Sequence, residues 1–156
     1  MLVVLDTNIL CKAVLLGNLD HISVLMLMMQ YKHCLTLDYE HMLENEYRGE
    51  VGKYELFTKW WKEMHGRALV YFCDGHLSER IAQDLMRLGF HEPQDHLVIA
   101  LAIHSGKYII TEDSDFGKGD PIRAGEHVAI LNYLSNSLEL IVDNAAEACE
   151  RLKSAS

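Results

Sequence analysis

Short apolar runs alternate along the chain with longer segments in which apolar residues recur at helical spacing. Leu2–Leu5 is entirely apolar, which is typical of a strand buried on both faces of a parallel sheet. Similar short runs predict further strands at 33–37, 68–73 and 107–111, and a fifth at 127–131.

The segments between these runs predict helices. Thr7 or Asn8 is placed to cap a first helix over 9–16, and Asp38 to cap one over 39–50. Other helices are expected at 19–32, 54–65 and 77–88, in a stretch that begins around Pro93 and ends at Gly106, and at the C-terminus over 138–153. Strands that alternate with helices in this way predict a three-layer α/β/α sandwich around a parallel sheet of four to five strands.

Two adjacent tryptophans, Trp60 and Trp61, lie in the predicted fourth helix. Neighbouring residues of a helix point in different directions, so we expect one indole in the core and the other at the surface.

Length and charge narrow the class of protein. The 156 residues, 49% of them hydrophobic, predict a single domain over 1–156 with a proper core. With a formal charge of −9, the surface as a whole does not attract nucleic acid. Any nucleic-acid substrate would therefore depend on metal ions and on a local basic patch, while a basic protein partner suits the surface directly.

Cysteine usage and the N-terminus predict a soluble cytoplasmic protein with no membrane segment. Cys11, Cys34, Cys73 and Cys149 are scattered and form no CxxC pair, which indicates reduced thiols. The apolar N-terminus lacks the basic region and cleavage site of a signal peptide, and the apolar stretch 22–29 is too short to cross a bilayer.

Three aspartates occupy positions where strands end or helices begin. Asp6 follows the first predicted strand, Asp113 follows the fourth, and Asp95 opens an apolar helical stretch. Strand ends of a parallel sheet share one crevice, so these carboxylates are expected to meet there. Two unit charges ~4 Å apart repel by ~4 kcal/mol at an effective dielectric of about 20. A divalent cation compensates that repulsion, and hard oxygen ligands favour Mg²⁺ or Mn²⁺.

Further acids and short polar residues are candidates for the same site. Spacing alone does not choose a fourth acid from the helix after the second strand, where Glu40, Glu44, Glu46 and Glu50 compete. Asp115 could reach a second ion or hold a water. The short polar residues that could orient carboxylates or waters are Thr7, Asn8, Thr111 and Ser114.

Three motifs give the chain a resemblance to a known family. LDTNIL at 5–10, QDHLVIALA at 94–102 and TEDSDF at 111–116 resemble the motifs of PIN-domain ribonucleases, in the same order and across about residues 1–130. In that family the remaining acid often precedes a tyrosine, so ENEY implies Glu46, with Glu44 as the alternative. The resemblance implies one or two Mg²⁺ or Mn²⁺ ions on Asp6, Glu46, Asp95 and Asp113, with Asp115 as an accessory acid.

The activity implied by this resemblance is hydrolysis of RNA phosphodiester bonds by an endoribonuclease. Many stand-alone PIN domains are toxins of toxin–antitoxin pairs, so an antitoxin or another protein inhibitor is an expected partner. Family members often dimerise, which makes a homodimer the expected assembly.

Two other classes of function remain open on the sequence. A catalytically silent PIN-like scaffold would bind RNA or a protein without cutting. A phosphoacceptor or phosphatase domain also places an aspartate after its first strand, but it normally has a basic residue after a late strand. TEDSDF stands at that position here and fits a metal better.

Overall fold

A five-stranded parallel sheet forms the centre of the computed structural model, which describes residues 1–155. The strands lie in the order β3-β2-β1-β4-β5, and every neighbouring pair is parallel. Their bounds are β1 Leu2–Leu5, β2 Cys34–Asp38, β3 Val70–Cys73, β4 Tyr108–Ile110 and β5 Ile141–Asp143. The predicted α/β fold with four to five parallel strands is confirmed.

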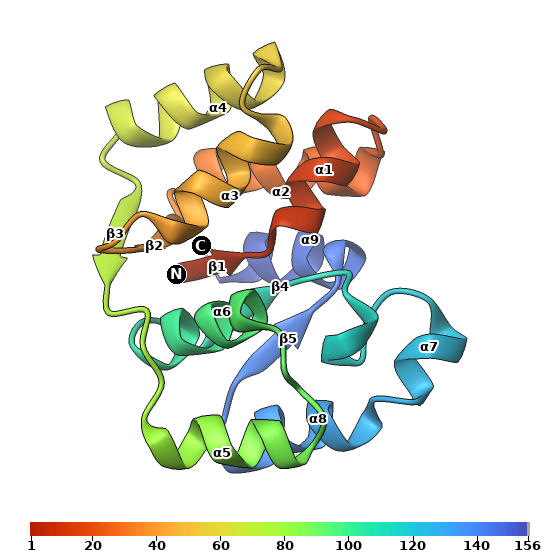
Figure 1. The fold of residues 1–156 in the computed structure, drawn as a ribbon. Coiled ribbons are helices and arrows are strands. Elements are labelled where there is room, and N and C mark those ends of the chain that lie inside the picture. The colour runs from red at the N-terminus through yellow and green to blue at the C-terminus, as the bar shows by residue number, and fades with distance from the viewer. Residues whose placement is uncertain (156) are drawn as a thin grey trace.

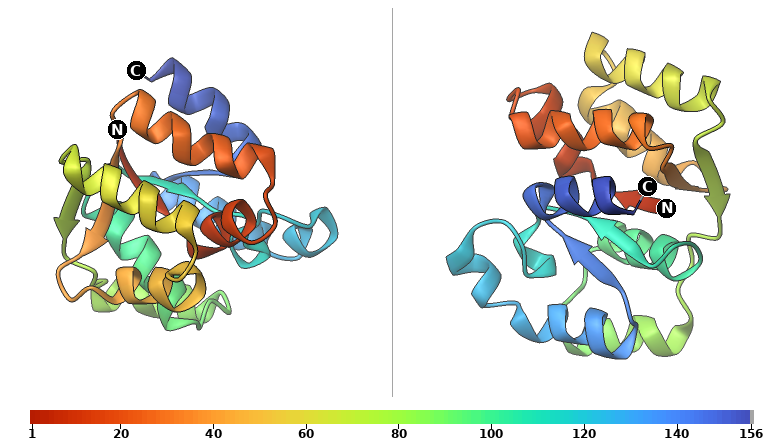
Figure 2. Two further views of the ribbon diagram at one scale, coloured as in Figure 1. Left: turned by 90° about the horizontal axis from the view of Figure 1, so that it is seen from above. Right: turned by 180° about the vertical axis from the view of Figure 1, so that it is seen from behind.

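Helices cover both faces of this sheet. Helices α1 to α4 lie on one side and α5 to α8 on the other (Figure 1), while α9 lies beside α2 (Figure 2). The helices are α1 Thr7–Val14, α2 Leu19–Gln30, α3 Met42–Val51, α4 Glu55–Gly66, α5 Glu79–Arg87, α6 Pro93–Ile103, α7 Pro121–Gly125, α8 Val128–Asn132 and α9 Ala145–Ser154. A 3₁₀ turn, η1, spans Ser114–Phe116, and a π-helical turn spans Tyr133–Ser137.

The order of the strands creates a crevice between β1 and β4. From β1 the chain moves outward to β2 and β3, then crosses back to β4 on the other side of β1. In open parallel sheets such a reversal leaves a crevice at the carboxyl ends of the two central strands, where ligands bind. Val4 pairs with Ile109 and Leu5 with Ile110, so β1 and β4 end side by side.

Helix α6 crosses the sheet within the core. Val3, Val4 and Leu5 of β1 are fully buried, and α6 packs on β1, β2 and β4. Every residue of α6 from Leu97 to Ala102 is buried, so this helix is apolar all round rather than amphipathic. Its N-terminus, which carries Asp95, is thereby held firmly beside the crevice.

Both tryptophans of α4 are buried, so the expectation that one would be at the surface is wrong. Trp60 is 1% exposed and donates a hydrogen bond from Nε1 to the carbonyl of Leu25 in α2 (3.0 Å). Trp61 is 8% exposed and packs edge-on against Tyr47 of α3, with ring centroids 6.0 Å apart. Two different helices receive the two neighbouring side chains, which the sequence pattern of α4 alone does not reveal.

The segment 127–131, predicted as the fifth strand, is instead helical: His127 is the N-cap of α8, and the other four residues lie in that helix. Ile130 and Leu134 are buried four residues apart, whereas Val128 is 49% exposed. This spacing is helical and buries one side of the segment only. The β-branched residues of the run favoured a strand locally, and packing against the rest of the domain overrode that preference.

The C-terminal helix begins later than the predicted 138–153. The first half of that range contains β5, which pairs with β4 through Tyr108 and Ile141. Helix α9 starts only at Ala145, after a capping box in which Asn144 and Glu147 bond each other's backbone N–H groups.

Two helix starts also differ from the predictions. Asp6, rather than Thr7 or Asn8, is the N-cap of α1. Asp38 is the last residue of β2, and α3 begins at Met42 rather than at residue 39. The Asp38 carboxylate still caps that helix, because it accepts hydrogen bonds from the backbone N–H groups of Met42 (2.8 Å) and Leu43 (3.0 Å).

All four cysteines are free thiols. Within residues 1–155, no single helix has the length and apolar character needed to cross a bilayer; α1 and α2 reach that threshold only as a pair, across a 113° bend.

Candidate metal centre

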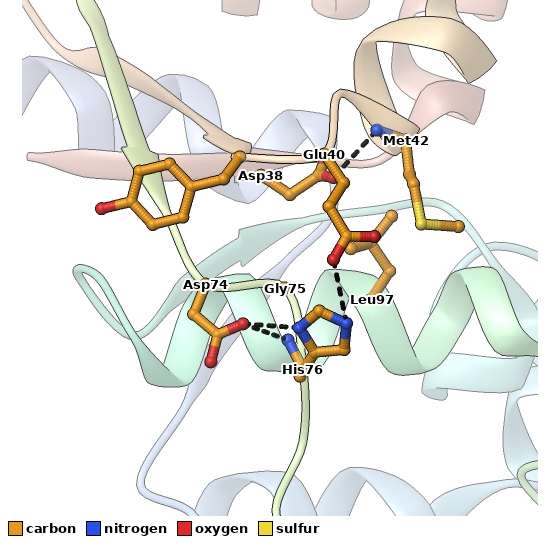
Figure 3. Close-up of a pocket in the computed structure, with 8 residues that line it drawn as sticks. Asp38, Glu40, Met42, Asp74, Gly75, His76 and Leu97 are labelled. Carbon is orange, nitrogen blue, oxygen red and sulfur yellow. Dashed lines mark hydrogen bonds and ion pairs between the residues drawn. The ribbon is translucent and has the colours of Figure 1, made fainter.

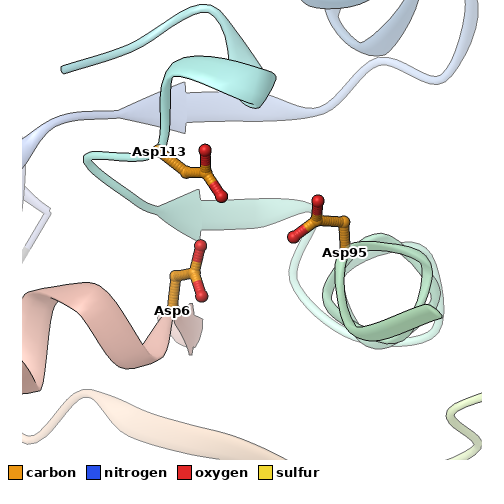
Figure 4. A group of neighbouring side chains, drawn as sticks. All are labelled: Asp6, Asp95 and Asp113. Carbon is orange, nitrogen blue, oxygen red and sulfur yellow. The ribbon is translucent and has the colours of Figure 1, made fainter. Parts of the chain in front are cut away.

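Three aspartates meet at the crevice between β1 and β4. Asp6, Asp95 and Asp113 each present one carboxylate oxygen, and these three atoms all lie within 4.8 Å of one another. Figure 4 shows the side chains pointing toward one another from the junction of β1 and α1, from α6 and from the turn after β4. The predicted convergence of these residues is therefore present in the fold.

Asp6 is held by hydrogen bonds on both carboxylate oxygens. As the N-cap of α1 it accepts the backbone N–H of Thr7 on Oδ1 (2.8 Å). Its Oδ2 accepts the Thr111 hydroxyl (2.8 Å) and lies 3.4 Å from the amide nitrogen of Asn8. These bonds fix the direction of a buried carboxylate and leave further lone pairs for a cation.

The Asp113 carboxylate is also held by a backbone N–H, at the end of β4. Its Oδ1 accepts the backbone N–H of Asp115 (2.9 Å) at the start of η1, and its own N–H donates to the Thr111 hydroxyl (3.0 Å). Its Oδ2 accepts no hydrogen bond from residues 1–155, and the carboxylate is directed toward those of Asp6 and Asp95 (Figure 4).

Asp95 enters from the opposite helix layer, in the first turn of α6. Pro93 is the first residue of that helix, where a missing N–H costs nothing. A carboxylate in the first turn also interacts favourably with the helix dipole. The side chain is buried, and among the described residues nothing donates a hydrogen bond to it.

Burial and mutual repulsion make these carboxyl groups hard to ionise. Burial raises the pKa of Asp6 to about 6, and the charges of Asp113 and Glu46 add to the rise, while the hydrogen bond from Thr111 opposes it. Burial, followed by the charges of Asp113, Asp6 and Asp115, raises the pKa of Asp95 to about 8. The fold thus places acids where ionisation is costly unless a positive charge is present.

Across the described part of the chain, no cationic side chain supplies that charge. None of the ion pairs identified within residues 1–155 includes Asp6, Asp95 or Asp113. Carboxylate oxygens alone are the donor set that suits Mg²⁺ or Mn²⁺, so these residues fit a hard divalent cation.

The predicted supporting residues form a network around Asp6. Thr111 is fully buried and bonds both Asp6 and the backbone of Asp113. Asn8 spans the same gap, since its amide nitrogen lies 3.4 Å from the Thr111 hydroxyl and its Oδ1 accepts the N–H of Glu112 (3.1 Å). Through these hydrogen bonds both residues link the end of β1 to the end of β4.

The two candidate glutamates of α3 have different surroundings. Glu44 is paired with Arg48 (2.9 Å) and His41 (3.4 Å). Glu46 is outside the group of three close oxygens, but its charge acts on Asp6 and raises the pKa of that carboxyl. Burial raises the pKa of Glu46 itself, and a hydrogen bond with the Thr7 side chain lowers it. Of the two, Glu46 is therefore the acid coupled to the centre.

Asp115 lies at the margin of the centre. Its charge raises the pKa of Asp95, but its oxygens are not within the close group. One of them is 3.6 Å from Nε2 of His127. Asp115 therefore acts on the centre through its charge and not as one of the three close carboxylates.

Gln94 and His127 are site neighbours that the sequence reasoning missed. With its amide nitrogen turned toward Glu46, Gln94 donates to that carboxylate (3.1 Å to Oε2). Gln94 could have been suspected from the sequence, because it immediately precedes Asp95. His127 had no signal of its own, because its proximity to Asp115 depends on how α7 and α8 fold back.

A second hollow, of about 60 Å³, lies where β2 and β3 end (Figure 3). Its acids already have partners: Asp38 caps α3, and His76 bridges Asp74 (2.7 Å) and Glu40 (3.2 Å). Among residues 1–155, the three aspartates of the crevice are the one group of three acids or other ligand residues with such close donor atoms. The crevice, rather than this hollow, is the candidate metal centre.

Comparison of the chain with protein-family models, with curated proteins and with solved structures found no match.

Proposed function

We propose that this protein is a Mg²⁺- or Mn²⁺-dependent endoribonuclease. The observation that carries the proposal is the convergence of Asp6, Asp95 and Asp113. One oxygen of each lies within 4.8 Å of the others, and no cationic side chain of residues 1–155 forms an ion pair with them. The resemblance of the three motifs to PIN-domain ribonucleases supplies the reaction class and the choice of RNA as substrate.

In this proposal Asp6, Asp95 and Asp113 hold the cation, and Glu46 and Asp115 complete the negative environment. Divalent ions in such sites activate a water for attack on phosphorus and stabilise the charge that develops on the phosphate oxygens. Thr111 and Asn8 keep Asp6 and the Asp113 backbone in register, so that the carboxylates do not have to reorganise during the reaction. No serine or histidine nucleophile is required.

The biological setting that we propose is the cytoplasm, where thiols stay reduced, which suits four free cysteines. The negative charge of the chain favours a basic partner. An antitoxin-like inhibitor that covers the acidic crevice fits this proposal, as does a homodimer.

RNA cleavage by the purified chain tests the proposal. An unstructured and a structured RNA are incubated with the wild-type protein and with Asp95→Asn, in Mg²⁺, in Mn²⁺ and in EDTA. Asp74→Asn serves as the matched control, because Asp74 is an exposed acid outside the crevice. We expect cutting by the wild type and by Asp74→Asn in either metal, and no cutting in EDTA or by Asp95→Asn.

Equal cutting by the wild type and Asp95→Asn would refute the assignment of the site. Absence of cutting, together with absence of Mn²⁺ binding by calorimetry, would favour a scaffold that binds RNA or protein without cleaving it.

A further inference from the structure

A hollow of about 110 Å³ opens beside the acidic centre; it is lined by Asp95, which belongs to the centre, and by Asp115, which lies at the margin of the centre. Pockets for drug-sized ligands measure ~300–1,000 Å³, so this space suits a much smaller group. It would hold only a few waters at ~30 Å³ each. We call it the flanking hollow.

The floor of the flanking hollow is apolar and firmly built. Phe90 and Ile130 line it, and each is 2% exposed. The Phe90 ring packs edge-on against Phe116 (centroids 5.0 Å apart) and stacks parallel to the His96 ring (5.9 Å, 6° between planes). His96 also donates from Nε2 to the carbonyl of Phe90 (2.6 Å), which anchors the loop before α6. A flat, uncharged group would meet a preformed surface here.

The polar lining is dominated by hydrogen-bond acceptors. Besides Asp95 and Asp115, it includes the exposed carboxylate of Glu92 and the imidazoles of His91 and His127. Within the described residues no lysine or arginine lines this space. A phosphate group would be repelled by the three carboxylates, whereas a neutral ring that carries N–H donors would be attracted.

We propose that the flanking hollow receives the base of a nucleotide next to the cleaved phosphodiester, and that it favours cytosine, adenine or guanine over uracil. The first three bases carry an exocyclic amino group that can donate to a carboxylate, as in acidic readout of the cytosine amino group. Uracil presents two carbonyl oxygens around a single N–H and would face the carboxylates with like partial charge. Reading of an unstacked base by its edge is the usual mode of sequence recognition in single-stranded RNA. This inference rests on the proposed nuclease function.

The test uses uridine-only oligonucleotides and the same strands with one cytidine, adenosine or guanosine placed internally. We expect the wild type in Mg²⁺ to cut beside the amino-bearing base about tenfold faster than it cuts the uridine-only strand, the discrimination of one good edge contact. Glu92→Gln replaces an acceptor by an amide that can also donate, so it should abolish most of this preference. Glu126→Gln removes the same charge from an exposed residue that does not line the hollow, and should keep the preference.

Equal cutting of all strands by the wild type would overturn the base preference and leave the nuclease proposal intact. A preference that survives in Glu92→Gln would equally overturn the role of this hollow.

A binding measurement separates the inference from the nuclease proposal. The imidazole signals of His127, assigned by comparison with His127→Gln, are followed by NMR during titration with cytidine and with uridine. Shifts that saturate with cytidine and are absent with uridine would support the base site even in a chain that cuts no RNA. Identical responses to the two nucleosides, or none, would overturn it.

Discussion

The hydroxyl of Thr111 donates a hydrogen bond to Oδ2 of Asp6 over 2.8 Å, between residues that are 105 positions apart in the chain. The hydroxyl oxygen of Thr111 also accepts the backbone N–H of Asp113 (3.0 Å). One buried hydroxyl therefore connects two of the three aspartates, and links the ends of β1 and β4 at the point where the strand order reverses.

We expect Thr111→Val to weaken cation binding and to lower stability. The substitution keeps the shape of the side chain but leaves the Asp113 N–H without its partner and removes one hydrogen bond of the Asp6 carboxylate, which costs about 1–3 kcal/mol. Loss of this bond also removes an interaction that lowers the pKa of Asp6, so that pKa should rise further. Urea unfolding and Mn²⁺ calorimetry measure the two effects. Thr111→Ser, which restores the hydroxyl, should recover most of the cation affinity; failure of this rescue would contradict the assigned role.

The ion-free protein should lose stability as the pH rises. In the unfolded chain Asp6 and Asp95 titrate near 3.8, whereas in the fold their pKa values are raised to about 6 and about 8. Between those values the folded state retains protons that the unfolded state has released, so the free energy of unfolding falls from about pH 4 to about pH 8. For Asp6 alone the difference is worth roughly 3 kcal/mol.

Urea denaturation in EDTA at about pH 5 and at about pH 8.5 measures this dependence. Mg²⁺ should add most stability at the higher pH, because the carboxylates must be deprotonated to bind it. Stability that rises with pH in EDTA would contradict the raised pKa values.

Asp95→Asn should separate stability from cation binding. At about pH 8.5 in EDTA the variant lacks one of the repelling charges, and we expect it to be more stable than the wild type. In Mg²⁺ the order should reverse, because the variant has lost a ligand. Thermal unfolding with and without the ion provides the measurement, and Asp74→Asn, which alters an exposed acid, should follow the wild type in both conditions.

The two glutamates of α3 can be distinguished by matched substitutions. Glu46→Gln should weaken cation binding and slow cleavage, since the charge of Glu46 acts on Asp6 and Gln94 already orients it. Glu44→Gln removes the same charge two residues away, where Arg48 is its partner, and should leave both properties close to the wild type. Similar effects of the two variants on cation affinity would show that Glu46 has no special place in the centre.

The sequence predicted the convergence of the aspartates because parallel strands end at one edge. Asp6 and Asp113 follow strands whose apolar residues are unambiguous, and the apolar residues after Asp95 predict a buried helix that starts near the same edge. Spacing alone could not choose between Glu44 and Glu46. The choice depends on which face of α3 is turned toward the crevice, and the packing of the whole domain sets that orientation.

The C-terminal third was predicted less well for a related reason. Strand β5 has three residues and exists because β4 offers an unpaired edge, through pairs such as Ile109 with Val142. A run that short has no periodicity of its own to detect. The position of His127 beside Asp115 likewise follows from tertiary packing rather than from any local pattern.

Gly119 should be required for the geometry of the loop that carries Asp113. Its φ is +78°, and a Cβ at this position would lie 2.1 Å from the carbonyl oxygen of Glu112, a backbone atom that cannot move away without moving Asp113. Gly119→Ala should therefore cost about 1–3 kcal/mol of stability or shift the loop, and should weaken cation binding. Gly125→Ala is the control, since a Cβ there has no atom within 4 Å, and this helical position should tolerate alanine or gain about 0.4–1 kcal/mol. Urea unfolding and Mn²⁺ titration of the two variants side by side test the argument. Wild-type cation affinity in Gly119→Ala would mean that the loop adapts without displacing Asp113, and that the centre depends on Thr111 and Asn8 rather than on this turn.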